Sequence, residues 1–238
     1  MSSTTVNNGI AHVADVLRSP VYASKEVLII IPNIRLANDK ATNKYIEYFG
    51  AISTFSAANE SGTQKFCAFR PRSKEDGNQI WVLEHFDSEL ALSKHRESSQ
   101  VHSMLSWLLN DEPNGLHSLP MPVPLQVMEG SFVQKTVADV QDPFVVLTQI
   151  GFEPETSTDV KEIIGNFGAA ARNQAELLMF LPGRTGNKIW AIAAYRSEQS
   201  YEDNGLVQTR FKEATKEQSL LGWKDIFLEI KAGYLQRP

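Results

Sequence analysis

"QIWVLEHFDSE" at residues 79–89 and "KIWAIAAYRSE" at residues 188–198 decide the fold, because one pattern occurs twice along the chain. Each stretch is typical of an apolar strand followed by a polar turn and a Ser-Glu pair that can open a helix. Three further pairs match in the same order: residues 46–53 with 164–171, 103–107 with 219–223, and 127–133 with 229–235. Four ordered matches indicate an internal duplication.

Each copy predicts the order β-α-β-β-α-β, which is the ferredoxin-like arrangement. The first copy has β-branched or apolar runs at 26–36, 64–71 and 79–86, and a helical pattern at 38–56. A sheet with apolar residues on both faces needs a cover on each face. The predicted fold class is therefore α+β, with two ferredoxin-like βαββαβ repeats packed sheet to sheet as an intramolecular dimeric α+β barrel.

The repeats also predict the domain boundaries. Residues 1–25 form an N-terminal segment that is partly helical, and residues 26–133 form the first repeat. Residues 134–142 are the predicted linker, and residues 143–238 form the second repeat. The first repeat enters its fourth strand through a proline-rich stretch.

Composition excludes several classes of protein. With 238 residues, 42% apolar and 21% charged, the chain can bury an ordinary core. A net charge of −5 gives no reason to expect nucleic acid or an anionic membrane as partner. The single cysteine, Cys67, rules out an internal disulfide, and no His/Cys pairs have zinc-ligand spacing. The expected setting is the cytoplasm, no metal is expected, and a homodimer is left open.

Three of the five histidines lie within residues 81–105. His95 and His102 are seven residues apart, so a single helix would place both on one face. Glu84 and His85 must point to opposite faces of their strand, because strand side chains alternate. A histidine in a cavity could act as a general base tuned by a carboxylate such as Glu84. The alternative is a packed histidine that only satisfies its hydrogen bonds.

The run that carries these histidines resembles the signature of the antibiotic biosynthesis monooxygenase family. The residues that match are Glu84, Phe86, Ser88, Ala91, Leu92, His95, Ser98, Ser99 and His102. The second copy keeps Tyr195 and Ser197 but has no histidine. The chain therefore resembles a tandem member of the family with one motif-bearing repeat and one degenerate repeat.

The resemblance implies a substrate site. In the family, an asparagine on the first strand, an aromatic residue ending the third and a histidine on the second helix surround the substrate. Asn33, Phe86 and His95 occupy comparable places here, and His85 and Trp81 are further candidate substrate contacts. The repeat also makes Trp81 a core candidate. The candidate catalytic residues are His95, Glu84 and His102.

The same resemblance implies a cofactor-independent monooxygenase that acts on an aromatic or polyketide-like small molecule with O₂, in secondary metabolism. The sequence contains no dinucleotide fingerprint in a strand–turn–helix context, so no cofactor is expected. One alternative is an oxygen-independent polyketide cyclase or dehydratase, and another is haem binding through His95. A third alternative is a non-catalytic barrel that binds a ligand or a partner.

Overall fold

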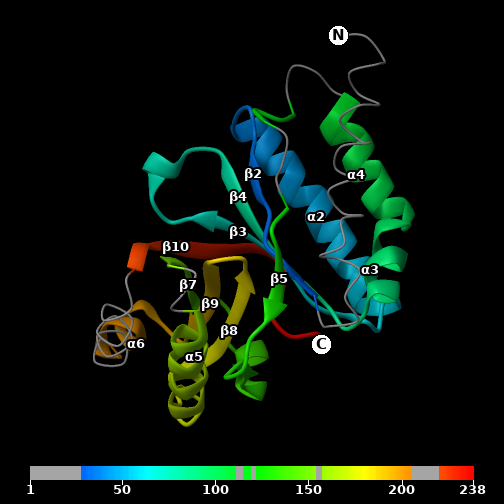
Figure 1. Ribbon diagram of the computed structural model, residues 1–238. Coiled ribbons are helices and arrows are strands. Elements are labelled where there is room, and N and C mark those ends of the chain that lie inside the picture. Colours follow the sequence, from blue (N-terminus) through cyan, green and yellow to red (C-terminus); the bar gives the residue numbers. More distant parts are fainter. Residues whose placement is uncertain (1–27, 111–114, 119–121, 154–156, 205–219) are drawn as a thin grey trace. The chain divides into compact units, whose positions relative to one another are not determined.

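A computed structural model describes residues 28–110, 115–118, 122–153, 157–204 and 220–238 (Figure 1). The predicted N-terminal segment, residues 1–25, lies outside these residues. The described chain divides into two compact units. Unit 1 contains the residues up to Pro124 together with Ile230–Pro238, and unit 2 contains Leu125–Glu229.

Unit 1 is an antiparallel sheet with helices on one face (Figure 1). Strand β4 is central: it pairs with β3 on one side and with β1 and β2 on the other. The elements in chain order are β1 (Leu28–Ile30), β2 (Asn33–Arg35), α2 (Asp39–Asn59), β3 (Thr63–Pro71), the short 3-10 helix η2 (Lys74–Asp76), β4 (Gln79–Phe86), α3 (Glu89–Arg96) and α4 (Ser99–Asn110).

Helix α2 supplies most of the helical side of the unit 1 core. It begins where the Asn38 side chain accepts a hydrogen bond from the Ala41 N–H at 2.9 Å, which satisfies a donor that the first turn leaves free. Tyr45 and Phe49 point from this helix to the sheet and are 2% and 1% exposed. They pack in one core cluster with Ile80 and Val82 of β4, so the even-numbered positions of β4 face the helices.

Unit 2 repeats this plan. Strand β9 pairs antiparallel with β7 and β8, and the first part of β10 pairs with β7. Its elements are β5 (Pro124–Val127), which begins in unit 1, then β6 (Phe132–Val133), the 3-10 helix η3 (Lys135–Asp139), β7 (Phe144–Phe152), α5 (Ser157–Ala171), β8 (Leu177–Thr185), β9 (Lys188–Tyr195), α6 (Glu198–Asp203) and β10 (Leu220–Tyr234). The predicted linker 134–142 therefore contains a short helix.

The two units exchange the last strand of each repeat. β6, which ends the first repeat in sequence, pairs with β8 of unit 2. The end of β10, which closes the second repeat, belongs to unit 1 and neighbours β3. Gly233 in this segment has φ +100°, and a Cβ there would collide with the Phe66 carbonyl oxygen, so a side chain does not fit. The compact units thus differ from the predicted repeats 26–133 and 143–238, whose boundaries remain a prediction about the sequence.

The α+β class with two ferredoxin-like repeats is confirmed, while two local predictions are wrong. The residues expected to form one helix through His95 and His102 form two helices, α3 and α4. The predicted equivalence of Trp107 and Trp223 also fails, because Trp107 lies on helix α4 and Trp223 lies on strand β10. Short apolar matches of five residues do not distinguish a helix from a strand.

Candidate functional site

Three of the predicted site residues lie together on the helix-facing side of β4. Glu84 and Phe86 follow Ile80 and Val82 at alternate positions, so they share the face that carries the core. The Phe86 ring centroid is 5.3 Å from that of His95 on α3. The alternation also confirms the prediction that Glu84 and His85 point to opposite faces.

The other three strand residues of the predicted site face the opposite side of the sheet. Asn33 is the direct cross-strand neighbour of Trp81, and His85 lies on the same face of β4. The Asn33 Nδ2 donates a hydrogen bond to the Gln79 Oε1 at 3.2 Å. The sheet itself therefore separates Asn33, Trp81 and His85 from His95, and one substrate pocket cannot contain all four.

His102 is also separated from His95. Helix α3 ends at Arg96, and α4 begins at Ser99, where the Ser98 hydroxyl accepts a hydrogen bond from the Val101 N–H at 3.4 Å. His95 is 3% exposed, whereas His102 lies on the exposed side of α4. The predicted shared face is wrong because the chain restarts its helix between the two histidines.

His95 is held by a carboxylate from a different element, Glu60 at the end of α2. The His95 Nδ1 and the Glu60 Oε2 are 2.7 Å apart, and their side chains are only 4% and 9% exposed. The imidazole also lies against two aromatic rings, with centroid distances of 4.8 Å to Phe66 and 5.3 Å to Phe86. The ring is therefore fixed in orientation on three sides.

The charge of Glu60 sets the direction of this hydrogen bond. Burial raises the pKa of the Glu60 carboxyl, but hydrogen bonds from His95 and Thr63 and the charge of His95 outweigh burial, so its pKa is lowered. The carboxylate can only accept, so the His95 Nδ1–H donates to it. In the neutral ring this leaves Nε2 as the nitrogen with a lone pair, which is the arrangement that a general base needs.

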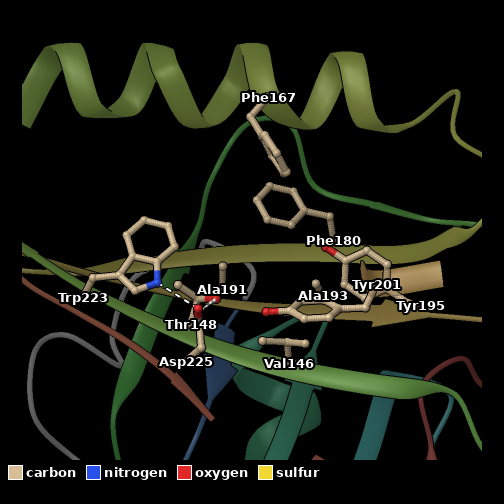
Figure 2. Close-up of a pocket in the computed structure, with 10 residues that line it drawn as sticks. All are labelled: Val146, Thr148, Phe167, Phe180, Ala191, Ala193, Tyr195, Tyr201, Trp223 and Asp225. Atoms are coloured by element: carbon tan, nitrogen blue, oxygen red, sulfur yellow. Dashed lines mark hydrogen bonds between the residues drawn. The ribbon is translucent and has the colours of Figure 1, made fainter. Parts of the chain in front are cut away.

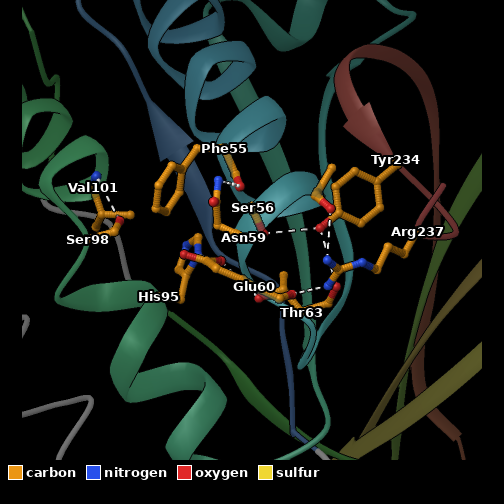
Figure 3. Close-up of polar contacts among 11 residues, drawn as sticks. Phe55, Ser56, Asn59, Glu60, Thr63, His95, Ser98, Val101, Tyr234 and Arg237 are labelled. Atoms are coloured by element: carbon orange, nitrogen blue, oxygen red, sulfur yellow. Dashed lines mark hydrogen bonds and ion pairs between the residues drawn. The ribbon is translucent and has the colours of Figure 1, made fainter.

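The chain's last residues hold Glu60 in place, as Figure 3 shows. The Arg237 guanidinium donates to the Glu60 carbonyl oxygen and, at 2.8 Å, to the Ala57 carbonyl oxygen. The Tyr234 hydroxyl donates to the Thr63 carbonyl oxygen at 3.3 Å and lies 3.1 Å from the Ser56 hydroxyl. Because the last carbonyls of a helix lack partners within it, the two Arg237 contacts cap the end of α2, while Tyr234 ties this end to the start of β3.

Sequence reasoning missed Glu60, Tyr234 and Arg237. Glu60 lies 35 residues before His95 in the chain, and Arg237 follows Glu60 by 177 residues. Glu60 is the residue that follows helix α2, within the polar stretch "SAANESG" at residues 56–62. On its own this stretch is typical of a solvated turn. Only the fold brings these residues to the histidine.

Glu84 is the second titratable group near His95. Burial raises the pKa of the Glu84 carboxyl, and the Glu60 charge raises it further, while the charges of His95 and Arg96 lower it. The net effect is a raised pKa. Glu84 in turn raises the pKa of the Tyr45 hydroxyl, although burial is the larger cause there. A carboxyl with a raised pKa takes up a proton more readily than an ordinary glutamate.

The residues that the structure describes contain neither a metal-binding cluster nor a membrane-spanning helix. No three His, Cys, Asp or Glu side chains among them are grouped so that they could hold a metal ion. Within the same residues, none of the helices has the length and apolar character required to cross a membrane.

A pocket lies in unit 2, and His95 does not line it. Its walls come from α5, α6 and four strands, and it has a free volume of about 30 Å³. Counting the space open to solvent, the hollow measures about 430 Å³. Figure 2 shows aromatic rings around it, from Phe167, Phe180, Tyr195, Tyr201 and Trp223. The expectation of a pocket lined by His95 with Asn33 or Phe86 therefore does not describe this hollow, which lies in the repeat without histidines.

Comparisons with known proteins find similarity in sequence over part of the chain and in fold over most of it. Residues 28–107 match the sequence profile of the antibiotic biosynthesis monooxygenase family. A comparison with curated proteins gives no significant match. A candidate monooxygenase from Fusobacterium nucleatum has a similar structure, with a TM-score of 0.74 and 17% identity over 90% of this chain and 97% of that one.

Two further structures are similar over most of the chain. A candidate monooxygenase from Lactobacillus acidophilus has a TM-score of 0.72 and 11% identity, covering 87% of this chain and 95% of that one. An anthrone oxidase-like protein has a TM-score of 0.59 and 12% identity, covering 87% and 92%. At these identities the likeness shows the fold.

Proposed function

We propose that this protein is a cofactor-independent monooxygenase that acts on a small aromatic molecule, because residues 28–107 match the sequence profile of the antibiotic biosynthesis monooxygenase family. The single observation that carries the proposal is the buried hydrogen bond between His95 and Glu60. It lies inside the matched residues and fixes the tautomer that a general base requires.

In the proposed reaction, the His95 Nε2 accepts an acidic C–H or O–H proton from the substrate. Glu60 stabilises the imidazolium that forms, since its carboxylate lies 2.7 Å from Nδ1. The substrate anion then passes an electron to O₂, and carbon–oxygen bond formation follows. Phe66 and Phe86 give the surroundings of His95 the apolar character that suits an aromatic substrate. Glu84, with its raised pKa, is the proposed second proton carrier.

The burial of His95 places a condition on this function. Its side chain is 4% exposed and lies against two rings. A ring-sized substrate can reach Nε2 only if side chains around the imidazole move, so the proposed enzyme opens before it reacts.

The same burial favours a second candidate function, ligand binding without turnover. In that case the His95–Glu60 pair only ties α3 to the end of α2. The pocket of unit 2 gives this candidate a place for the ligand.

An oxygen-consumption assay with anthrone separates the candidates. Conversion of anthrone to anthraquinone takes one O₂ and releases one water, so both gas uptake and absorbance report on it. We expect His95→Gln to lower kcat by about 10²- to 10⁴-fold with the thermal midpoint of unfolding measured alongside. His117→Gln is the matched control, because His117 is exposed and remote in sequence from the site.

Three outcomes have distinct meanings. A His95→Gln rate within a few fold of wild type refutes the role of His95. Turnover that persists under strict anaerobiosis favours the cyclase or dehydratase alternative. Absence of turnover with anthrone and with other phenolic aromatics favours binding without chemistry.

A further inference from the structure

The pocket of unit 2 exists because small residues replace larger ones at equivalent positions. In the repeat alignment, Ala191 and Ala193 on β9 correspond to Val82 and Glu84 on β4. The strand pairing agrees, because Phe180 pairs with Ala193 just as Phe66 pairs with Glu84. The second repeat therefore has two short side chains where the first has an isopropyl group and a carboxylate.

A pair of aromatic rings covers these positions in both units. In unit 1, Phe49 of α2 stacks on Phe66 with centroids 4.2 Å apart. In unit 2, Phe167 of α5 meets Phe180 at 4.8 Å, edge to face. Because the aromatic pair is retained while the side chains of β9 beneath it are smaller, a hollow remains between helix and sheet, as Figure 2 shows.

The walls combine ring faces with hydrogen-bond acceptors. Tyr195 and Tyr201 meet edge to face at 5.3 Å at one end. At the other end the Asp225 carboxylate accepts hydrogen bonds from the Trp223 Nε1–H at 3.0 Å and from the Thr148 hydroxyl at 2.7 Å. These bonds fix the carboxylate at the edge of the hollow (Figure 2). Rings favour an aromatic ligand, and a carboxylate favours a hydrogen-bond donor and repels an anion.

We propose that this pocket is a second binding site of the protein, which takes a single-ring aromatic molecule carrying a hydrogen-bond donor. The ring lies over Ala191 and Ala193 beneath Phe167, and its donor points toward Asp225. The size limits the ligand to a single ring that lies partly in the open part of the hollow, because the free volume is about 30 Å³ and reaches about 430 Å³ only when space open to solvent is included. This site is separate from His95, and its occupation does not depend on the proposed enzyme activity.

Trp223 provides a direct reporter, because its indole N–H is bonded to Asp225. The chain has four tryptophans, so a ¹H–¹⁵N spectrum contains four indole signals, and the Trp223→Phe variant identifies the one that matters. The probe is p-cresol, compared with toluene, which lacks the donor, and with 4-methylbenzoate, which is an anion. We expect p-cresol to shift the Trp223 signal saturably. Toluene should bind at least about tenfold more weakly, as expected for loss of a hydrogen bond to a charged group, and 4-methylbenzoate should not bind.

Two alanine substitutions test the location. Ala191→Val restores the side chain of the first repeat and fills part of the pocket, so p-cresol affinity should fall at least about tenfold. Ala170→Val makes the same change on the exposed side of α5 and should leave binding unchanged. If Ala191→Val lowers the thermal midpoint strongly, Thr148→Val serves instead, because it removes one bond that holds Asp225.

The results that overturn the proposal are equally direct. A Trp223 signal that p-cresol does not move, or equal affinity for p-cresol and toluene, contradicts the assigned ligand. Unchanged affinity in Ala191→Val contradicts the assigned place. His95→Gln should keep p-cresol binding, so failure of this site and failure of the proposed enzyme activity are separately visible.

Discussion

Replacing His85 by leucine should make the protein more resistant to acid. His85 lies on β4 between Ile29 and Lys65 of the neighbouring strands. Both of its ring nitrogens are buried, and neither has a hydrogen-bond partner among the described residues. Burial, and secondarily the charge of Lys65, lowers the pKa of His85 from 6.5 to about 3. The folded protein therefore keeps this imidazole neutral well below the pH at which the unfolded chain protonates it.

The magnitude follows from proton linkage. Between pH 6.5 and 3 the unfolded state binds one proton more than the folded state at this residue, so the free energy of unfolding falls as the pH falls. Each pH unit corresponds to about 1.4 kcal/mol. From pH 7.5 to pH 4.5 the His85 contribution amounts to a loss of about 2 to 3 kcal/mol. The leucine variant has no proton to bind and should not show this part of the loss.

Urea unfolding at pH 7.5 and pH 4.5, followed by tryptophan fluorescence, measures both proteins. Other titrating groups contribute equally to wild type and variant, so the difference between the two pH dependences isolates His85. His117→Leu, on an exposed histidine, should reproduce the wild-type pH dependence. Equal losses of stability in wild type and His85→Leu would refute the reasoning, because they would mean that His85 is protonated in the folded state.

Three further predictions concern single contacts. Glu60→Gln should destabilise the protein by about 2 kcal/mol at pH 7 in urea unfolding. Because the Glu60 pKa is lowered in the fold, the difference in stability between wild type and variant should vanish as the pH falls below 4.5. A difference that stays constant with pH would contradict this prediction. Lys65 has its pKa lowered from 10.5 to about 8 by burial, so wild-type stability should rise by about 3 kcal/mol between pH 8 and 10.5, and Lys65→Met should lack that rise. Gly233→Ala should lower the thermal midpoint, since φ is +100° and the Phe66 carbonyl blocks a Cβ; an unchanged midpoint would mean that the end of β10 is not held there.

The strand and helix order was predictable because it depends on local periodicity and on repetition. Runs such as 79–86 alternate regularly enough to specify a strand and the faces of Glu84 and His85. The break between α3 and α4 was missed because "HRESSQ" contains good helix formers, and the capping role of Ser98 depends on where the next turn starts. Local propensity does not decide such a restart.

The site was less predictable because its contacts are long-range. The resemblance selected His95 and Phe86, which do meet. Glu60 could not be found this way, since its pairing with His95 needs α2 and α3 to end side by side. The second repeat was interpreted as degenerate because it lacks histidines, yet Ala191 and Ala193 are the substitutions that open the pocket. The smaller side chains are visible in the repeat alignment, but whether a loss of volume leaves a hollow depends on how the neighbouring side chains pack.

The placement of Ile230–Pro238 in unit 1 has a consequence for how the protein is made. A ribosome releases the first hundred residues long before the segment with Tyr234 and Arg237 is made, so the nascent chain exposes an open edge of β3 until that segment has been synthesised. Unit 1 is therefore the first unit to be synthesised and the last to complete its fold. Loss of residues 230–238 would therefore harm unit 1 more than unit 2, although unit 2 lies next to them in the sequence.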